Sequence, residues 1–179
     1  MPANKQNILP IRVYGDPVQR QKTAPVKTID GRLSSLADQM IESLASARGL
    51  GLAAPQVGHS QALCIINLPA LDSKHTESLI LINPKLQASD GKIVYQEGCL
   101  SFPGMYADVA RPQHVMVTGL DRDGNPLELE ASDFLARVFL HEMDHLNGVL
   151  FIDHLSPIKR QLLKKQLKEI SATAGDKVK

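Results

Sequence analysis

The feature that most constrains this chain is a pair of histidines one helical turn apart, next to an apolar segment. Residues 141–145 have the sequence HEMDH and directly follow a mostly apolar stretch, residues 134–140. On a helix over residues 132–147, His141 and His145 project from the same face. Polar groups buried in a central helix cost free energy unless they bind or pair with something. We therefore expect this helix to be central and to hold a metal ion.

Glu142 lies beside the two histidines, on the adjoining side of the same helix. From there its carboxylate can reach a water molecule at the metal without being a ligand itself. A Lewis acid, an activated water and a nearby proton acceptor are what metal-assisted hydrolysis requires. The competing interpretation is a polar cluster on a solvated helix face.

A catalytic metal needs a third protein ligand and one open position. Cys99 is a candidate because the glycine and proline residues that flank it favour a tight loop. A thiolate together with two imidazoles also suits iron, zinc, nickel or cobalt. The residues alone leave this ligand role level with that of a buried structural cysteine. We expect His154 to be a surface or capping residue. The remaining candidates are His59, His75, His114 and Cys64. The three histidines lack ligand spacing, and Cys64 lies in an apolar run that predicts a buried strand.

The hydrophobic pattern predicts an α+β fold. Helical spacing predicts a helix around residues 33–44, the motif helix over 132–147 and a C-terminal helix over 156–170. The predicted apolar stripe of the last helix consists of Ile158, Leu162, Leu163, Leu167 and Ile170. Short runs without helices between them predict antiparallel strands at residues 62–68, 79–83, 92–96, 114–120 and 126–130. The last two flank a strong hairpin turn at residues 121–125.

Length and composition predict one catalytic domain over residues 1–179, with an ordered core at about 7–170 and a polar tail at 171–179. A formal net charge of +1 gives no sign of DNA binding. No apolar run approaches the roughly 18 residues of a membrane span. The first ten residues have no signal or transit pattern. We expect a cytoplasmic protein, or one in an organelle interior if a targeting segment has been removed, and we expect a monomer.

Three segments occur in the order found in peptide deformylases, which this chain resembles. They are residues 49–56 (GLGLAAPQ), residues 97–101 (EGCLS) and residues 141–145 (HEMDH). Shorter matches to the family lie between and around these segments. The resemblance as a whole covers about residues 7–170. The resemblance implies antiparallel β-sheets surrounding a central metal-binding helix, with an N-terminal helix and a C-terminal helix packed outside.

The resemblance also implies the site and the reaction. Cys99, His141 and His145 would hold one divalent ion, Fe(II) by preference, with zinc or nickel possible in its place. Glu142 would move the proton, and the Gln56 amide and the Leu100 backbone N–H would bind the oxyanion. The substrates would be nascent N-formylmethionyl peptides. The products would be formate and the same peptides with a free amino terminus. The implied substrate-binding residues are Gly51, Leu50, Glu97, Arg111 and Val138.

Two features carry alternative interpretations. Arg137 stands where the family often has an apolar pocket residue, so its guanidinium either lies in solvent at the pocket mouth or favours acidic or small residues after methionine. The basic residues of the C-terminal helix either form a solvated face or contact ribosomal RNA. These residues are Lys159, Arg160, Lys164, Lys165 and Lys168.

Three other functions compete with deformylation. A metallopeptidase would use the same helix, but no third histidine or glutamate ligand is evident. A formyl-peptide or ribosome-binding module without catalysis would be expected to have lost Glu142, Gln56 or a ligand. A thiolate metal sensor would have no use for Glu142 beside a closed site.

Overall fold

A computed structural model describes residues 7–174. The elements in chain order are η1 (Pro17–Arg20), α1 (Gly31–Ala47), β1 (Gly51–Ala53), η2 (Ala54–Val57), β2 (Leu63–Ile66), α2 (Leu68–Leu71), β3 (Leu79–Asp90), β4 (Ile93–Cys99), β5 (Phe102–Arg111), β6 (His114–Leu120), β7 (Pro126–Ser132), α3 (Asp133–Leu146), η3 (Phe151–His154) and α4 (Pro157–Ala172). The predicted tail at residues 171–179 begins inside α4, and residues 175–179 lie outside the described part.

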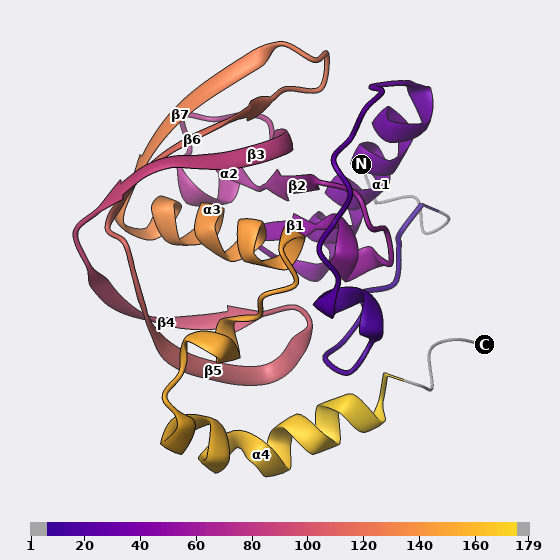
Figure 1. Ribbon diagram of the computed structural model, residues 1–179. Coiled ribbons are helices and arrows are strands. Elements are labelled where there is room, and N and C mark those ends of the chain that lie inside the picture. The colour runs from indigo at the N-terminus through magenta and orange to yellow at the C-terminus, as the bar shows by residue number, and fades with distance from the viewer. Residues whose placement is uncertain (1–6, 175–179) are drawn as a thin grey trace.

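Two antiparallel sheets enclose the helix α3, which confirms the predicted α+β class. The larger sheet has the order β1-β2-β3-β6-β7, and β4 pairs with β5 in a separate hairpin. In Figure 1, α3 runs between the larger sheet and this hairpin. The apolar side of α3 packs on the larger sheet, where Phe139 and Met143 meet Leu81 and Val117. The helix is therefore central, as its apolar flank predicts.

Helix α1 covers the other face of the larger sheet. Its N-cap is Asp30, whose carboxylate accepts hydrogen bonds from the backbone N–H groups of residues 32 and 33, each at 3.0 Å. It ends where Arg48 adopts a left-handed conformation, with φ of 53°. Leu36, Met40 and Leu44 face the sheet and are buried. The cap and the terminal turn together direct the chain into β1, which borders the site.

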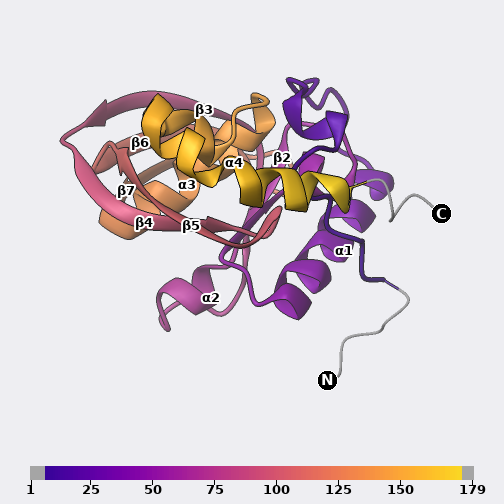
Figure 2. The same cartoon turned by 90° about the horizontal axis from the view of Figure 1, so that it is seen from below.

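The hairpin β4–β5 lies on the opposite side of α3, and α4 packs outside it against β5 (Figures 1 and 2). The predicted apolar stripe of α4 is packed over only part of its length. Ile158 and Leu162 are 75% and 80% exposed, whereas Ile170 is buried. From Leu163 onward, α4 packs on the cluster formed by Phe102, Phe151 and their neighbours.

Within residues 7–174, no helix combines the length and the apolar character needed to cross a membrane.

Replacing Leu81 with alanine is expected to lower the free energy of unfolding by about 2–5 kcal/mol, because this β3 side chain is fully buried between two layers. The matched control is Leu86→Ala on the same strand, where the leucine is 44% exposed and the loss should stay within about 0.5 kcal/mol. Urea unfolding of both variants measures the difference. Equal losses would contradict the placement of the core around Leu81.

Candidate metal and catalytic site

Three potential metal ligands from two parts of the chain converge beside α3. Cys99 is the last residue of β4, and His141 and His145 lie one turn apart on α3. One ligand atom from each lies within 4.8 Å of the other two, and Cys99 Sγ is 3.3 Å from His145 Nε2. The structure thus brings together the three residues that the sequence predicts as ligands. One thiolate and two imidazoles form a donor set that fits a tetrahedral transition-metal site with one open position.

The two histidines differ in their surroundings. Burial, helped by the neighbouring His141, lowers the pKa of His145 and keeps its imidazole neutral, which is the form that ligates a metal. Burial also opposes a charge on His141, but hydrogen bonds to Cys99 and Glu97 outweigh it and raise the pKa of His141. A metal ion at this histidine would therefore displace a proton.

Glu97 contacts His141 at the Nδ1 side of the imidazole ring. Its Oε2 atom is 3.0 Å from His141 Nδ1, and Arg111 binds both carboxylate oxygens, through Nε at 2.5 Å and Nη2 at 3.0 Å. Burial alone would raise the pKa of Glu97, but the hydrogen bonds from His141 and Arg111 hold it well below its usual range. Glu97 is therefore a permanent anion that orients the His141 imidazole, one of the three potential ligands.

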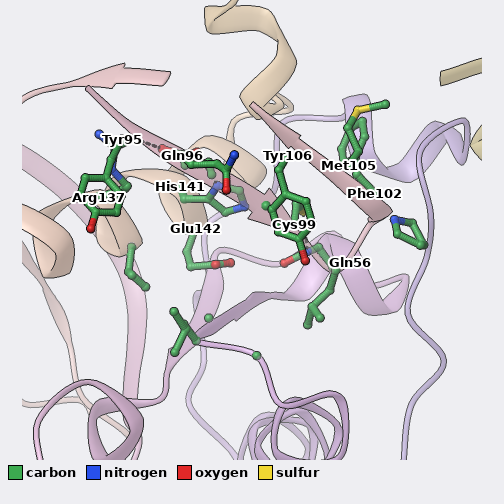
Figure 3. A pocket seen from close by; sticks show the side chains of 18 of the residues that line it. Gln56, Tyr95, Gln96, Cys99, Phe102, Met105, Tyr106, Arg137, His141 and Glu142 are labelled. Atoms are coloured by element: carbon green, nitrogen blue, oxygen red, sulfur yellow. Dashed lines mark hydrogen bonds and ion pairs between the residues drawn. The ribbon is translucent and has the colours of Figure 1, made fainter. Parts of the chain in front are cut away.

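Glu142 is buried and faces the space in front of the ligands (Figure 3). Burial raises the pKa of Glu142 to about 7. Its Oε2 atom has no hydrogen-bond partner among residues 7–174. Its Oε1 atom lies so close to Gly51 that a Cβ placed there would be 2.3 Å away. A carboxyl group with a free oxygen and a pKa near neutrality is suited to moving protons.

Gln56 lies on the opposite side of the same space. Its Oε1 atom accepts the Ala53 N–H at 2.9 Å, and its Nε2 atom donates to Ser101 Oγ at 3.2 Å and contacts Cys99 Sγ at 3.5 Å. The bond to Ala53 settles which end of the amide points at the ligands. Leu100 follows Cys99 in the turn between β4 and β5 and also borders this space.

A cavity of about 680 Å³ opens in front of these groups. Of the predicted catalytic, metal-binding and substrate-binding residues, those that line it are Leu50, Gly51, Gln56, Glu97, Cys99, Leu100, Val138, His141 and Glu142. Sequence reasoning missed the aromatic residues that complete the wall, which are Tyr95, Phe102, Tyr106 and Phe134. Tyr95 and Phe134 contact edge to face, with ring centroids 6.0 Å apart. The two tyrosines are difficult to identify from sequence, because tyrosines on strands are common on ordinary protein surfaces.

Two sequence expectations require correction, those for Arg137 and Arg111. Arg137 borders the cavity but does not extend into solvent at its mouth, because it is 3% exposed and bonded to Glu97 at 2.6 Å. Arg111 is not among the residues that line the cavity, since its guanidinium binds Glu97 and Asp144 instead. His154 lies on the surface, as expected, and its Nε2 atom lies 2.7 Å from Asp144 Oδ2.

The chain is similar in sequence to known proteins over most of its length. The family model described as polypeptide deformylase matches residues 8–161. The chain is 46% identical over 169 residues to a peptide deformylase of Syntrophobacter fumaroxidans, covering 92% of this chain and 99% of that protein. It is 44% identical over 161 residues to one of Thermodesulfovibrio yellowstonii, covering 90% of this chain and 97% of that protein.

Solved structures show the same similarity. The crystal structure of a peptide deformylase from Legionella pneumophila matches with a TM-score of 0.85 and 38% identity, covering 95% of this chain and 99% of the other. A peptide deformylase from Synechococcus elongatus, solved in complex with actinonin, matches with a TM-score of 0.82 and 42% identity. That match covers 96% of this chain and 90% of the other.

Proposed function

Since the chain belongs to the peptide deformylase family and hydrolyses the N-formyl group of N-formylmethionyl peptides, we propose that the reaction takes place where the β4–β5 turn meets α3. The observation that carries this proposal is the convergence of three ligand atoms beside a buried glutamate that faces a large cavity. The proposed metal ligands are Cys99, His141 and His145. A divalent ion at these ligands supplies a Lewis acid that polarises the formyl carbonyl and lowers the pKa of water.

We propose Fe(II) as the metal, with zinc or nickel able to replace it. The donor set supports a borderline or soft divalent ion rather than magnesium or calcium, which prefer oxygen ligands. The resemblance to the family favours iron among the candidates. A ferrous ion next to a thiolate is prone to oxidation, so activity is expected to decay in air.

Glu142 is proposed to carry the proton. Its carboxylate accepts a proton from the water that attacks the formyl carbon, and it returns that proton to the amine that leaves. The carbon–nitrogen bond breaks, and formate and a free amino terminus are released. The unpaired Oε2 atom of Glu142 supports this role, because a carboxylate already held in an ion pair would be a weaker base.

Gln56 and Leu100 are proposed to bind the oxyanion that forms during the attack. The anchored Gln56 amide points its Nε2 toward Cys99, and Leu100 follows Cys99 directly in the chain. Donors held in place before the reaction stabilise developing charge without reorganising.

The cavity in front of the site is proposed to hold the methionine side chain. Leu50 and Val138 contribute apolar wall, and the aromatic residues extend it. Gly51 sits at the end of β1, an edge strand, where a substrate backbone can pair with it. A tight fit around the formyl carbon, which bears only hydrogen, would exclude the additional methyl of an acetyl group by steric clash.

The first test is formate release from a formyl-methionyl peptide by protein purified without oxygen. Release from the formyl peptide and none from the matching acetyl peptide is the expected result. Inhibition by actinonin is also expected, because a similar deformylase was solved with it. A folded, metal-loaded protein that releases no formate would overturn the proposal and favour a binding module.

Replacing Gly51 with alanine is expected to lower kcat by about 10²-fold, because the new Cβ would push Glu142 from its place by ångström-scale amounts. The control is Gly31→Ala at the start of α1, where a Cβ meets nothing within 4 Å and activity should not change. Steady-state kinetics of both variants with the formyl peptide makes the comparison. A fully active Gly51→Ala enzyme would show that the close contact is unimportant.

We further propose that the chain acts as one catalytic domain and as a monomer, in the cytoplasm or an organelle interior. For α4 we propose a contact with ribosomal RNA, and the alternative is a solvated basic face. Exposed basic residues together with the exposed Ile158 and Leu162 support a contact surface. Co-sedimentation with ribosomes that persists after Lys164 and Lys165 are replaced with glutamate would contradict this contact.

A further inference from the structure

Beside the contact of Tyr95 with Phe134, the interface between α3 and the β4–β5 hairpin is formed by charged groups. Arg137, His141 and Asp144 form a stripe on α3 at helical spacing, and the hairpin presents Glu97 and Arg111 to it. Glu97, Arg111 and Arg137 are each at most 5% exposed. By contrast, the opposite side of α3 packs on the larger sheet through apolar residues. Polar contacts therefore set much of the position of the hairpin relative to α3.

Glu97 is held at both of its oxygens. Arg137 Nη1 donates a hydrogen bond to Oε1 at 2.6 Å, and Arg111 Nε donates to the same oxygen. Oε2 accepts a hydrogen bond from Arg111 Nη2 and lies next to His141 Nδ1. An ionised carboxylate only accepts hydrogen bonds, so the hydrogen must be on His141 Nδ1. Nε2 is then the nitrogen that is left for a metal.

Arg137 does more than neutralise Glu97. Its guanidinium also donates to the Val109 carbonyl at 2.9 Å and to the Ile93 carbonyl at 3.0 Å. These carbonyls belong to β5 and β4, so one side chain from α3 reaches both strands of the hairpin. A planar guanidinium with five N–H donors can serve three acceptors at fixed angles, which a lysine ammonium on a flexible stem cannot reproduce.

The three proposed metal ligands span this same interface. Two of them, His141 and His145, are on α3, and the third, Cys99, is on the hairpin two residues after Glu97. A shift of the hairpin against α3 would therefore change the distances between the thiolate and the imidazoles. Buried ion pairs contribute little net stability because desolvation offsets their attraction. A role in geometry explains the buried arginine better than a role in stability.

We propose that Arg137 is a positioning residue that acts through Glu97 and the two strand carbonyls to set the orientation of His141 and the placement of Cys99. The proposal rests on the proposed function of the site as a metal centre. It assigns Arg137 no contact with the reacting atoms.

The test compares Arg137→Lys with wild type in the cobalt-substituted holoenzyme. The matched control is Arg122→Lys, because Arg122 also makes a two-pronged pair with a carboxylate, that of Asp38, but on the exposed surface. Three quantities are measured. They are the thiolate-to-cobalt absorption, the rate of cobalt loss to a chelator, and kcat and KM for a formyl-Met-Ala peptide.

Arg137→Lys is expected to weaken metal affinity by about 10–100-fold and to alter the cobalt spectrum. It should also lower kcat, with KM for the short peptide changed less than about 2-fold, since its target is the geometry of the metal ligands. Arg122→Lys should match wild type in all three. A purely structural role predicts a lower melting temperature with unchanged spectrum, affinity and kcat, and that result would overturn the proposal.

A second variant keeps the proposal testable if Arg137→Lys does not fold. Glu97→Gln breaks the same chain of contacts from the carboxylate side and is expected to give the same spectral and affinity changes. A folded Glu97→Gln protein with wild-type spectrum and affinity would overturn the proposal. Failure of the proposed function is distinct from both, because wild type itself would then show neither a thiolate-to-cobalt band nor formate release.

Discussion

Replacing Glu142 with glutamine lowers kcat/KM for formate release by about 10²–10⁴-fold, because the amide keeps the shape of the side chain but cannot accept and return a proton. The fold should survive the change. Glu142 is buried and is in none of the ion pairs of residues 7–174, so the substitution removes a charge whose desolvation costs free energy. The melting temperature is therefore expected to stay level or to rise.

The control for this variant is Glu130→Gln, because Glu130 lies exposed on β7 outside the cavity lining. Steady-state kinetics, metal content and a thermal melt are measured on both proteins. If Glu142→Gln retains its metal and more than about a tenth of wild-type activity, the proposed role of Glu142 in proton transfer would be contradicted. The proton would then have to travel by another group.

Replacing Cys99 with alanine abolishes metal-dependent stabilisation. A ligand present at 100 times its dissociation constant stabilises the folded state by about 2.7 kcal/mol. For a chain of 179 residues this corresponds to a rise in melting temperature of about 5–10 °C. Wild type should show this rise on addition of the divalent ion, and Cys99→Ala should show none, with deformylation lost as well.

Cys64→Ala is the matched control, because Cys64 is fully buried in β2 and is not part of the ligand cluster. This variant should melt at a lower temperature than wild type, since a buried side chain is shortened, yet keep the full rise on adding metal. Differential scanning fluorimetry with and without the ion gives both values. A full metal-dependent rise in Cys99→Ala would remove Cys99 from the ligand set.

The sequence predicted the three long helices well, because their signals are local, and missed the short helix α2. Asp30 and Arg48 bound α1 close to where the apolar spacing and the glycines place its ends. The hairpin turn at residues 121–125 was also predicted, and the β6–β7 pairing confirms it. Both kinds of signal lie within a few residues, so no knowledge of distant contacts is needed.

The strand β5 (Phe102–Arg111) was not predicted, because the residues that alternate toward solvent and core include Pro103, Gly104 and Asp108. Its identity as a strand comes from pairing with β4, where Glu97 is opposite Ala107. Strand propensity depends strongly on such cross-strand neighbours. β3 likewise extends seven residues beyond its predicted end, because its exposed half pairs with β6.

Arg137 shows why burial is difficult to infer from residue type. An arginine is rarely buried without partners, so placement in solvent was the natural expectation. The partners exist, but they lie on the two strands of the hairpin, at Ile93, Glu97 and Val109. Sequence separations of 28 to 44 residues hide such a network from any local pattern.

The sequence by itself determined the chemistry of this protein. The spacing of His141, Glu142 and His145 follows from the helical repeat, and the order of three motifs points to a deformylase. Tertiary structure alone decided the geometry that makes the chemistry possible. It brought Cys99 to the histidines, placed Glu142 against Gly51 and buried Arg137, because each of these contacts joins segments that only packing brings together.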